Sequence, residues 1–165
     1  MVALIKLIDT VLLAFLTVVA VAAPLDVGLC LSPKIQPDFL LRLQFLYTRK
    51  YGEYLATQRP GFFVALVWLE VLFMWPLAVL NLYGNLGGRR WFNATSSVFG
   101  ASYCTAMIAV GTELMYSHSV SNSLLMAHFL FIGCGVLAIL RSLLPNAGKT
   151  LATGRTIELS GKKKA

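Results

Sequence analysis

The residues of this chain that could take part in chemistry are three ionisable side chains inside long apolar segments: Asp26, Glu70 and His128. Glu70 is the most unusual of them, because it is the only charged residue between Gly61 and Tyr83. A carboxylate in the hydrocarbon of a bilayer costs about 2.5–3.5 kcal/mol, so it faces the interior of a helix bundle, binds a partner or stays protonated. Glu70 therefore predicts a polar site inside the membrane.

The composition sets the environment of these side chains. Of the 165 residues, 58% are hydrophobic and only 13% are charged, and the mean hydropathy is +0.74, which indicates an integral membrane protein rather than a soluble domain. The net charge is +7, but the basic residues lie outside the apolar runs and form no basic and aromatic face, so no nucleic-acid partner is expected. Cys30, Cys104 and Cys134 are odd in number and widely spaced, which favours buried thiols; neither a metal site nor another cofactor is expected.

The first apolar segment, at about residues 4–31, determines whether Asp26 can reach Glu70. Its alanine-rich tract before Pro24 resembles a signal-peptidase site, but the chain remains apolar from Leu25 to Leu31 except for Asp26. We therefore favour an uncleaved helix that continues past Pro24 and is kinked there, since proline removes a backbone donor. Asp26 then lies ~8 Å below the membrane surface. At the other end of the segment, Lys6 and Asp9 are spaced i, i+3 and are expected to pair.

The second segment, at about residues 61–83, is long enough to span a bilayer. Glu70 lies roughly nine residues beyond Gly61, or ~13 Å, near the middle of the membrane. Pro76 cannot donate to the carbonyl of Leu72, so this helix should bend close to Glu70. Helical spacing places an apolar and aromatic set on the same face as Glu70: Phe63, Leu66, Val67, Phe73, Met74 and Leu77.

Between these segments, residues 32–60 change in character, with prolines at both ends. An amphipathic helix is expected here, because apolar and charged residues alternate with helical spacing. It is either a surface helix without further function or a cover over the entrance for a ligand. The apolar face comprises Phe39, Leu40, Leu43, Leu46, Tyr47, Tyr51, Tyr54 and Leu55, and the charged face Arg42, Arg49, Lys50 and Glu53.

The third and fourth segments, at about residues 91–116 and 123–144, complete an all-α bundle of four transmembrane helices, followed by a basic tail over 146–165. In the third, a stripe of hydroxyl side chains is expected to face the bundle, as structural contacts or as ligand contacts; it comprises Thr95, Ser102, Thr105 and Thr112. His128 lies roughly two turns inside the fourth helix, where a neutral hydrogen-bonding role is the more ordinary one. Glu113 lies near the end of its span, where a carboxylate costs little.

The distribution of charge predicts the orientation and the compartment. The connection from Gly84 to Arg90 contains Arg89 and Arg90 and no acid, which favours the cytosolic side. With four spans, both termini then lie in the cytosol. Lys162 and Lys163 are the fourth and third residues from the end and match a dilysine retrieval pattern, which predicts the endoplasmic reticulum membrane.

In several motifs the chain resembles the EXPERA family, which includes the emopamil-binding sterol isomerase. The resemblance covers nearly the whole chain and rests mainly on the order and spacing of three acids. The motifs that contain them are Pro-Leu-Asp-Val at Pro24–Val27, Tyr-Gly-Glu at Tyr51–Glu53 and Leu-Glu-Val-Leu-Phe-Met-Trp-Pro at Leu69–Pro76. A Gly/Arg-rich turn before Trp91, Arg141 and the lysine tail also match. It implies that Asp26 receives a cationic amine, that Glu70 hydrogen-bonds to Asp26 and that Glu53 is structural. His128 stands where a receptor of this family has a tyrosine near its pocket.

Physical chemistry supports the pairing of the two acids. Two carboxyl groups close together in a medium of low dielectric constant do not both ionise readily, so one remains protonated and donates to the other. A pocket of this kind suits an amine or a sterol, and the ligand-binding set expected is Asp26, Glu70, Phe63, Leu66, Phe73, Met74, Thr105 and His128. A sterol-transport membrane protein and a second copy of the chain are possible partners, besides membrane lipids.

Three functions remain open on this basis. The first is a protein that binds sterols and amines and acts in intracellular sterol homeostasis or transport. The second is a sterol double-bond isomerase, with Glu70, Asp26 and His128 as proton donors and acceptors. Against it, the chain has Leu66 where the isomerase has a histidine one turn before the glutamate, which makes binding the stronger prediction. The third, a structural scaffold, leaves Glu70 unexplained.

Overall fold

The computed structural model describes residues 2–30, 36–51, 58–116 and 121–144. Glu53, Lys162 and Lys163 lie outside the described residues. Each element within these ranges is helical, and four helices are long and apolar enough to cross a bilayer: Ala3–Gly28, Gly61–Leu86, Phe92–Tyr116 and Asn122–Leu143. The prediction of an all-α bundle with four spans is confirmed.

Six α-helices and one π-helical turn make up the described chain. α1 (Val2–Cys30) is the first span, and α2 (Asp38–Tyr51) is the short helix expected between the first two spans. The second span consists of α4 (Gly61–Leu69), the π-helical turn η1 (Glu70–Met74) and α5 (Trp75–Leu86). The third and fourth spans are α6 (Phe92–Tyr116) and α7 (Asn122–Leu143).

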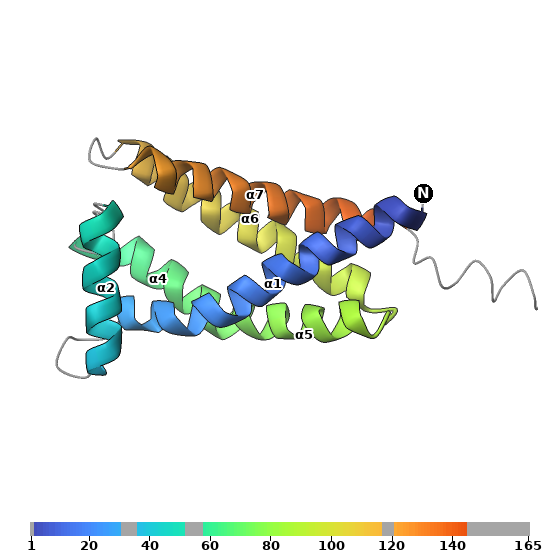
Figure 1. Ribbon diagram of the computed structural model, residues 1–165, viewed down its shortest axis with the longest axis horizontal. Helices are drawn as coiled ribbons and strands as arrows, with labels where there is room; N and C mark the ends of the chain where they lie inside the picture. The colour runs from blue at the N-terminus through green and yellow to red at the C-terminus, as the bar shows by residue number, and fades with distance from the viewer. Residues whose placement is uncertain (1, 31–35, 52–57, 117–120, 145–165) are drawn as a thin grey trace, which may run out of the picture.

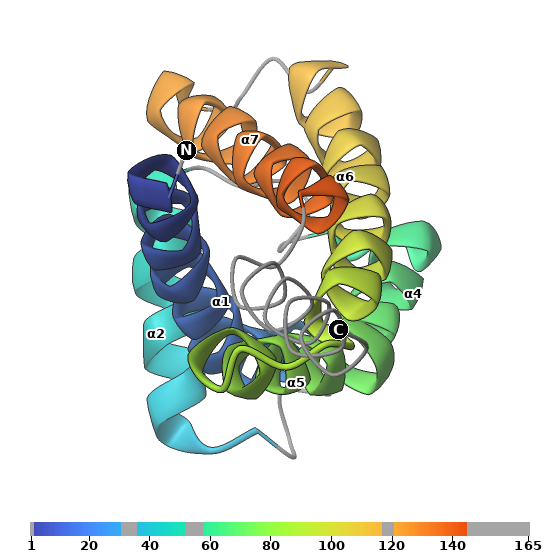
Figure 2. The same cartoon turned by 90° about the vertical axis from the view of Figure 1, so that its right-hand side faces the viewer.

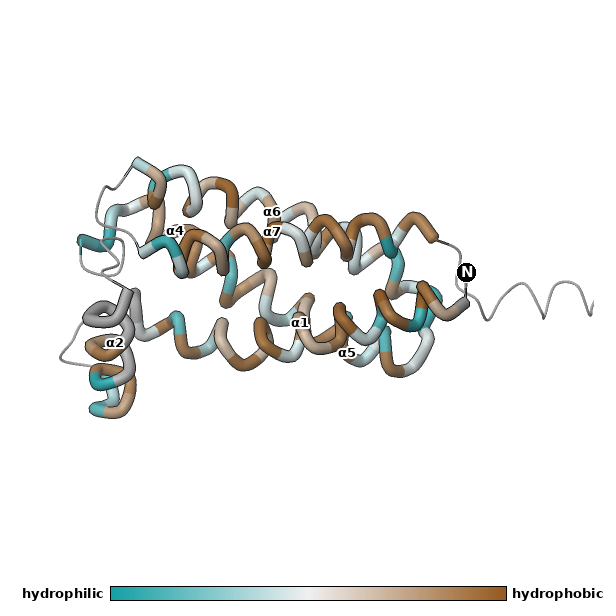
Figure 3. The backbone as a smooth tube through the Cα atoms, turned by 45° about the horizontal axis from the view of Figure 1, so that its top comes forward, coloured by the Kyte–Doolittle hydropathy of each residue, from teal (hydrophilic) through white to brown (hydrophobic). Residues whose placement is uncertain are grey.

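The four spans lie side by side and α2 crosses one end of them (Figure 1). Seen along the bundle, α1, α7, α6 and α5 follow one another around a common centre (Figure 2). Hydrophobic residues predominate along the spans, hydrophilic residues gather near their ends, and the coloured part of α2 carries residues of both kinds (Figure 3). The central core joins all four spans and includes Leu12, Phe15, Leu16, Met74, Ala78, Phe99, Tyr103 and Ala138.

Small residues of α6 and α7 allow these two spans to approach each other closely. A Cβ atom on Gly100 would come within 2.6 Å of the carbonyl oxygen of Gly135, and one on Gly135 within 2.6 Å of Cys104 Sγ. Ser96, one turn before Gly100, donates from its hydroxyl to the carbonyl of Ala138 at 3.2 Å. Such a row of small residues lets two helix backbones meet where lipid supplies no hydrophobic drive.

The hydroxyl stripe expected on this face of α6 is arranged differently. Thr105 and Thr112 are exposed, and their hydroxyls donate to the carbonyls of Ala101 and Ile108 in their own helix. Of the stripe, Thr95 makes a contact between spans, donating to Asn81 Oδ1 at 2.6 Å. Glycine and cysteine allow a closer approach than threonine, so they take the interface and leave Thr105 and Thr112 outside.

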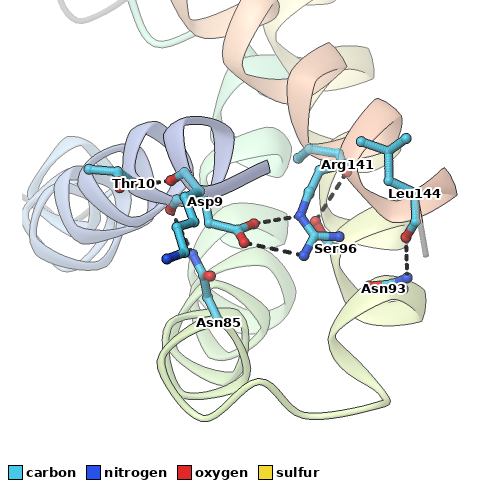
Figure 4. A network of polar contacts seen from close by, with 9 residues as sticks. Asp9, Thr10, Asn85, Asn93, Ser96, Arg141 and Leu144 are labelled. Atoms are coloured by element: carbon cyan, nitrogen blue, oxygen red, sulfur yellow. Dashed lines mark hydrogen bonds and ion pairs between the residues drawn. The ribbon is translucent and has the colours of Figure 1, made fainter. Parts of the chain in front are cut away.

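A polar cluster ties α1 to α5 and α7 at the end of the bundle opposite α2 (Figure 4). Asp9 accepts from Arg141 Nε at 2.5 Å and from Arg141 Nη2 at 3.3 Å, and its backbone carbonyl accepts from Asn85 Nδ2 at 2.9 Å. Arg141 is buried, with its side chain 6% exposed. The expected pairing of Asp9 with Lys6 is therefore wrong: the partner is a residue 132 positions away, which the fold brings close.

Candidate functional site

A cavity of about 380 Å³ lies in the half of the bundle next to α2. All four spans contribute to its wall, and Leu40 of α2 also lines it. Its size falls within the ~300–1,000 Å³ typical of small-molecule sites, and its wall is mostly apolar. The lining comprises Val18, Val19, Ala22, Leu25, Asp26, Gly28, Leu40, Phe63, Leu66, Val67, Glu70, Met74, Tyr103, Ala106, Met107, Val110, His128 and Phe131.

The two membrane carboxyl groups, Asp26 and Glu70, line this cavity together. They come from different spans and are close enough to interact electrostatically. Asp26 reaches the site because α1 continues through Pro24 to Cys30, as the apolar sequence after Pro24 predicts. A helix ending before Pro24 would have left Asp26 outside the bundle. The structure thus brings together the two acids that could receive a cation or a hydroxyl group.

Glu70 begins the π-helical turn of the second span. Its backbone carbonyl accepts from the N–H of Trp75, five residues on, instead of from a residue four positions on. Pro76 has no N–H to donate to Leu72, so the α-helical ladder is interrupted in this turn and a π turn takes its place. At this place, where the sequence predicts a bend, the structure has a change of hydrogen-bond register. Turns of this kind often occur at functional sites.

The π turn explains where the predicted neighbours of Glu70 lie. Because a π turn holds more residues than an α turn, the fourth residue after Glu70 returns to its face and the third does not. Met74 accordingly lines the cavity and is only 1% exposed, while Phe73 is 44% exposed and lies outside the lining. Phe63 and Leu66, in the regular helix α4, line the cavity as the α-helical spacing predicts.

His128 provides a third polar group in the wall. Its Nδ1 lies 3.0 Å from the carbonyl oxygen of Leu124, one turn earlier in α7. A carbonyl oxygen only accepts, so Nδ1 carries the hydrogen and, in the neutral ring, Nε2 is the acceptor. The site therefore combines two carboxyl groups with a histidine whose tautomer is set by its own helix.

Tyr103 is a site residue that the sequence prediction missed. It lines the cavity, is 4% exposed, and lies close enough to interact electrostatically with both Asp26 and Glu70. Thr105, predicted instead, is exposed on the outside of α6. The stripe that does face the bundle could have been found from its spacing, because it repeats every three or four residues and mixes bulky with small side chains: Phe99, Tyr103, Ala106 and Val110.

Metal binding is a further possibility for grouped acids and histidines. Within residues 2–30, 36–51, 58–116 and 121–144, no group of three or more His, Cys, Asp or Glu side chains is placed to hold a metal ion. Cys104 and Cys134 are free thiols. Asp26, Glu70, Tyr103 and His128 provide the described cavity with groups for hydrogen bonding, charge pairing and proton transfer.

Comparison with known proteins identifies the family of this chain. The model of the EXPERA family (EXPanded EBP superfamily) matches residues 39–143. The chain belongs to the EXPERA family. A relative, Sigma intracellular receptor 2 of Xenopus tropicalis, is 24% identical over 103 residues, which are 62% of this chain. The match spans about 60% of the length of that curated relative, and no solved structure matches the chain.

The EXPERA match begins in α2, so α1 lies outside it. Glu70, Tyr103 and His128 are within the matched region, whereas Asp26 is not. The place of Asp26 in the site therefore rests on the geometry of this chain. With four spans and this family membership, the chain is a multi-pass membrane protein of the EXPERA family.

Proposed function

We propose that this protein is an intramembrane receptor that binds sterols and cationic amphiphilic amines. The observation that carries the proposal is that Asp26 and Glu70 line one largely apolar cavity between the four spans. A carboxyl pair that keeps one proton holds a single net negative charge, which matches one ammonium group. The family of the chain and the name of its Xenopus tropicalis relative, a receptor, point in the same direction.

The rest of the wall suits an amphiphile. An ammonium or hydroxyl group binds to the two carboxyl groups, and rings or chains fill the apolar part between Phe63, Val67 and Phe131. His128 offers Nε2 as an acceptor, so a ligand with a second donor gains one more hydrogen bond. Buried donors and acceptors of this kind discriminate strongly against ligands that leave them unpaired.

The cellular role that follows is sterol homeostasis or transport in the endoplasmic reticulum membrane, with both termini in the cytosol. The support is the family resemblance, the arginines of the Gly84–Arg90 connection and the lysines that follow the fourth span. The protein would act through partners, such as a sterol-transport membrane protein or a second copy of itself.

Binding of a radiolabelled cationic amphiphilic amine to the full-length protein tests the proposal. Asp26→Asn and Glu70→Gln should each weaken binding by about 30- to 1,000-fold, because truncating one partner of a buried charge contact costs about 2–4 kcal/mol. Glu113→Gln is the matched control, since Glu113 lies in α6 outside the cavity lining. Undiminished binding in both site variants would show that the amine binds elsewhere.

A sterol double-bond isomerase is the second candidate, and one observation favours it. His128 lines the same cavity as both carboxyl groups, so a proton donor and a proton acceptor are present together. Leu66, in place of the histidine of the isomerase, also lines this cavity and weighs against catalysis. Expression in a strain that lacks the isomerase decides between the two. Restored sterol conversion, abolished by Glu70→Gln, would replace the binding-only function.

A further inference from the structure

The helix α1 contains an interior proline, and a second span supplies what that proline cannot. Pro24 has no N–H, so it leaves the carbonyl of Ala20 without the donor that an α-helix would provide four residues on. The indole Nε1 of Trp75 donates to this carbonyl oxygen at 2.9 Å. The hydrogen bond joins residues 55 positions apart, and it connects α1 to the first residue of α5.

The positions of these two residues matter for the cavity. Ala20 lies between Val19 and Ala22, which line the cavity, and Asp26 follows less than two turns later in α1. Trp75 directly follows Met74, and its backbone N–H donates the closing hydrogen bond of the π turn to the carbonyl of Glu70. One residue therefore contacts the carbonyl of Glu70 with its backbone and α1 with its side chain.

We propose that Trp75 is a positioning residue that fixes α1 against the second span and thereby sets the placement of Asp26 relative to Glu70. The inference extends the proposed binding function but concerns the geometry of the site whatever its ligand. Inside a bilayer no water is available for a free carbonyl, so Ala20 needs a donor from the protein. The indole supplies it one turn before Pro24, where the backbone of α1 lacks a hydrogen bond.

The packing of a large ring is the ordinary alternative, and it predicts something different. If Trp75 acted by its size alone, Trp75→Phe would hardly change the ordering of α1, because Trp75 is 37% exposed and phenylalanine retains most of its packing contacts. If the indole N–H is what holds α1 in place, Trp75→Phe should loosen α1 around Pro24, because phenylalanine cannot donate to the carbonyl of Ala20. This loosening of α1 should then be smaller in a chain where Pro24→Ala provides a backbone N–H to the same carbonyl.

The experiment measures amide hydrogen exchange of the full-length protein in lipid nanodiscs for the wild type, Trp75→Phe, Pro24→Ala and the double variant. Trp68→Phe is the matched control, since Trp68 lies in the same span with a similarly exposed ring, 42% against 37%. Trp75→Phe should speed exchange about 3- to 15-fold in residues 21–28 of α1 and leave residues 8–16 unchanged. In the Pro24→Ala background, the same substitution should change exchange less than twofold.

Amine affinity provides a second readout. Measured on the folded fraction of the protein, the amine affinity of Trp75→Phe should be about 3- to 15-fold weaker than that of the wild type. The affinity of Trp68→Phe should be unchanged. A wild type that binds no amine would contradict the proposed function, while the exchange measurement would still decide the role of Trp75. Unchanged exchange in Trp75→Phe, or equal damage with and without Pro24, would overturn the inference.

Discussion

The two ends of the EXPERA bundle use polar residues in opposite ways. At the end away from α2, Asn85 and Arg141 each donate a hydrogen bond to Asp9, which joins three spans. At the end next to α2, Asp26 and Glu70 line a cavity instead. Polar groups paired across spans hold helices together, and polar groups that line a cavity can in addition bind a ligand. Substitutions at the two ends should therefore separate stability from binding.

Asp9→Asn should have the largest effect on stability. It leaves the buried Arg141 without its counter-charge, and breaking a buried ion pair costs about 3–5 kcal/mol of unfolding free energy. Thermal unfolding of the purified protein measures the loss. The double variant with Arg141→Met should recover much of it, because no unpaired charge remains. Amine affinity of the folded fraction should be unchanged; a lower affinity would mean that the two ends are coupled.

The same substitution at two buried alanines should give opposite results. Ala138→Leu enlarges a side chain that is 2% exposed in the close-packed core, and overpacking of this kind costs about 1–3 kcal/mol. Ala106→Leu puts its extra atoms toward the cavity, so it should cost less stability but weaken amine binding by about tenfold or more. Unfolding and binding measured on both variants test the contrast. A strongly destabilised Ala106→Leu that binds normally would contradict the position of the cavity.

Thr105→Ala should have the smallest effect on both properties. The hydroxyl is exposed and donates to Ala101 in its own helix, so its removal should change the unfolding free energy by less than about 0.5 kcal/mol. Amine affinity should stay within twofold of the wild type. A marked loss of affinity would instead support the sequence-based expectation that Thr105 contacts the ligand.

Much of this architecture could be predicted because a bilayer allows few solutions. The four spans follow from apolar length, and Glu70 stands out as one acid in an apolar run. The extension of α1 past Pro24 was predicted because the sequence stays apolar after the proline. Asp26 and Glu70 could thus be proposed as neighbours before the structure placed them in one cavity.

The parts that could not be predicted depend on contacts between residues distant in the sequence or on the hydrogen-bond register within a helix. Arg141 is 132 positions from Asp9, and local spacing favoured Lys6 instead. The sequence does not single out Tyr103, because the hydroxyl stripe indicates another face of α6 than the one that glycine and cysteine bury. Phe73 was placed by α-helical spacing, which does not hold across a π turn.

The π turn at Glu70 affects how the second span of this chain aligns with the second span of its relatives. A π turn accommodates one extra residue within a helix, so it is equivalent to a single-residue insertion into an uninterrupted α-helical span. A relative whose second span is wholly α-helical would then be one residue shorter between its glutamate and its proline. An alignment without a gap there would pair Phe73 with a residue that faces the cavity, and would transfer the ligand contact to the wrong side chain.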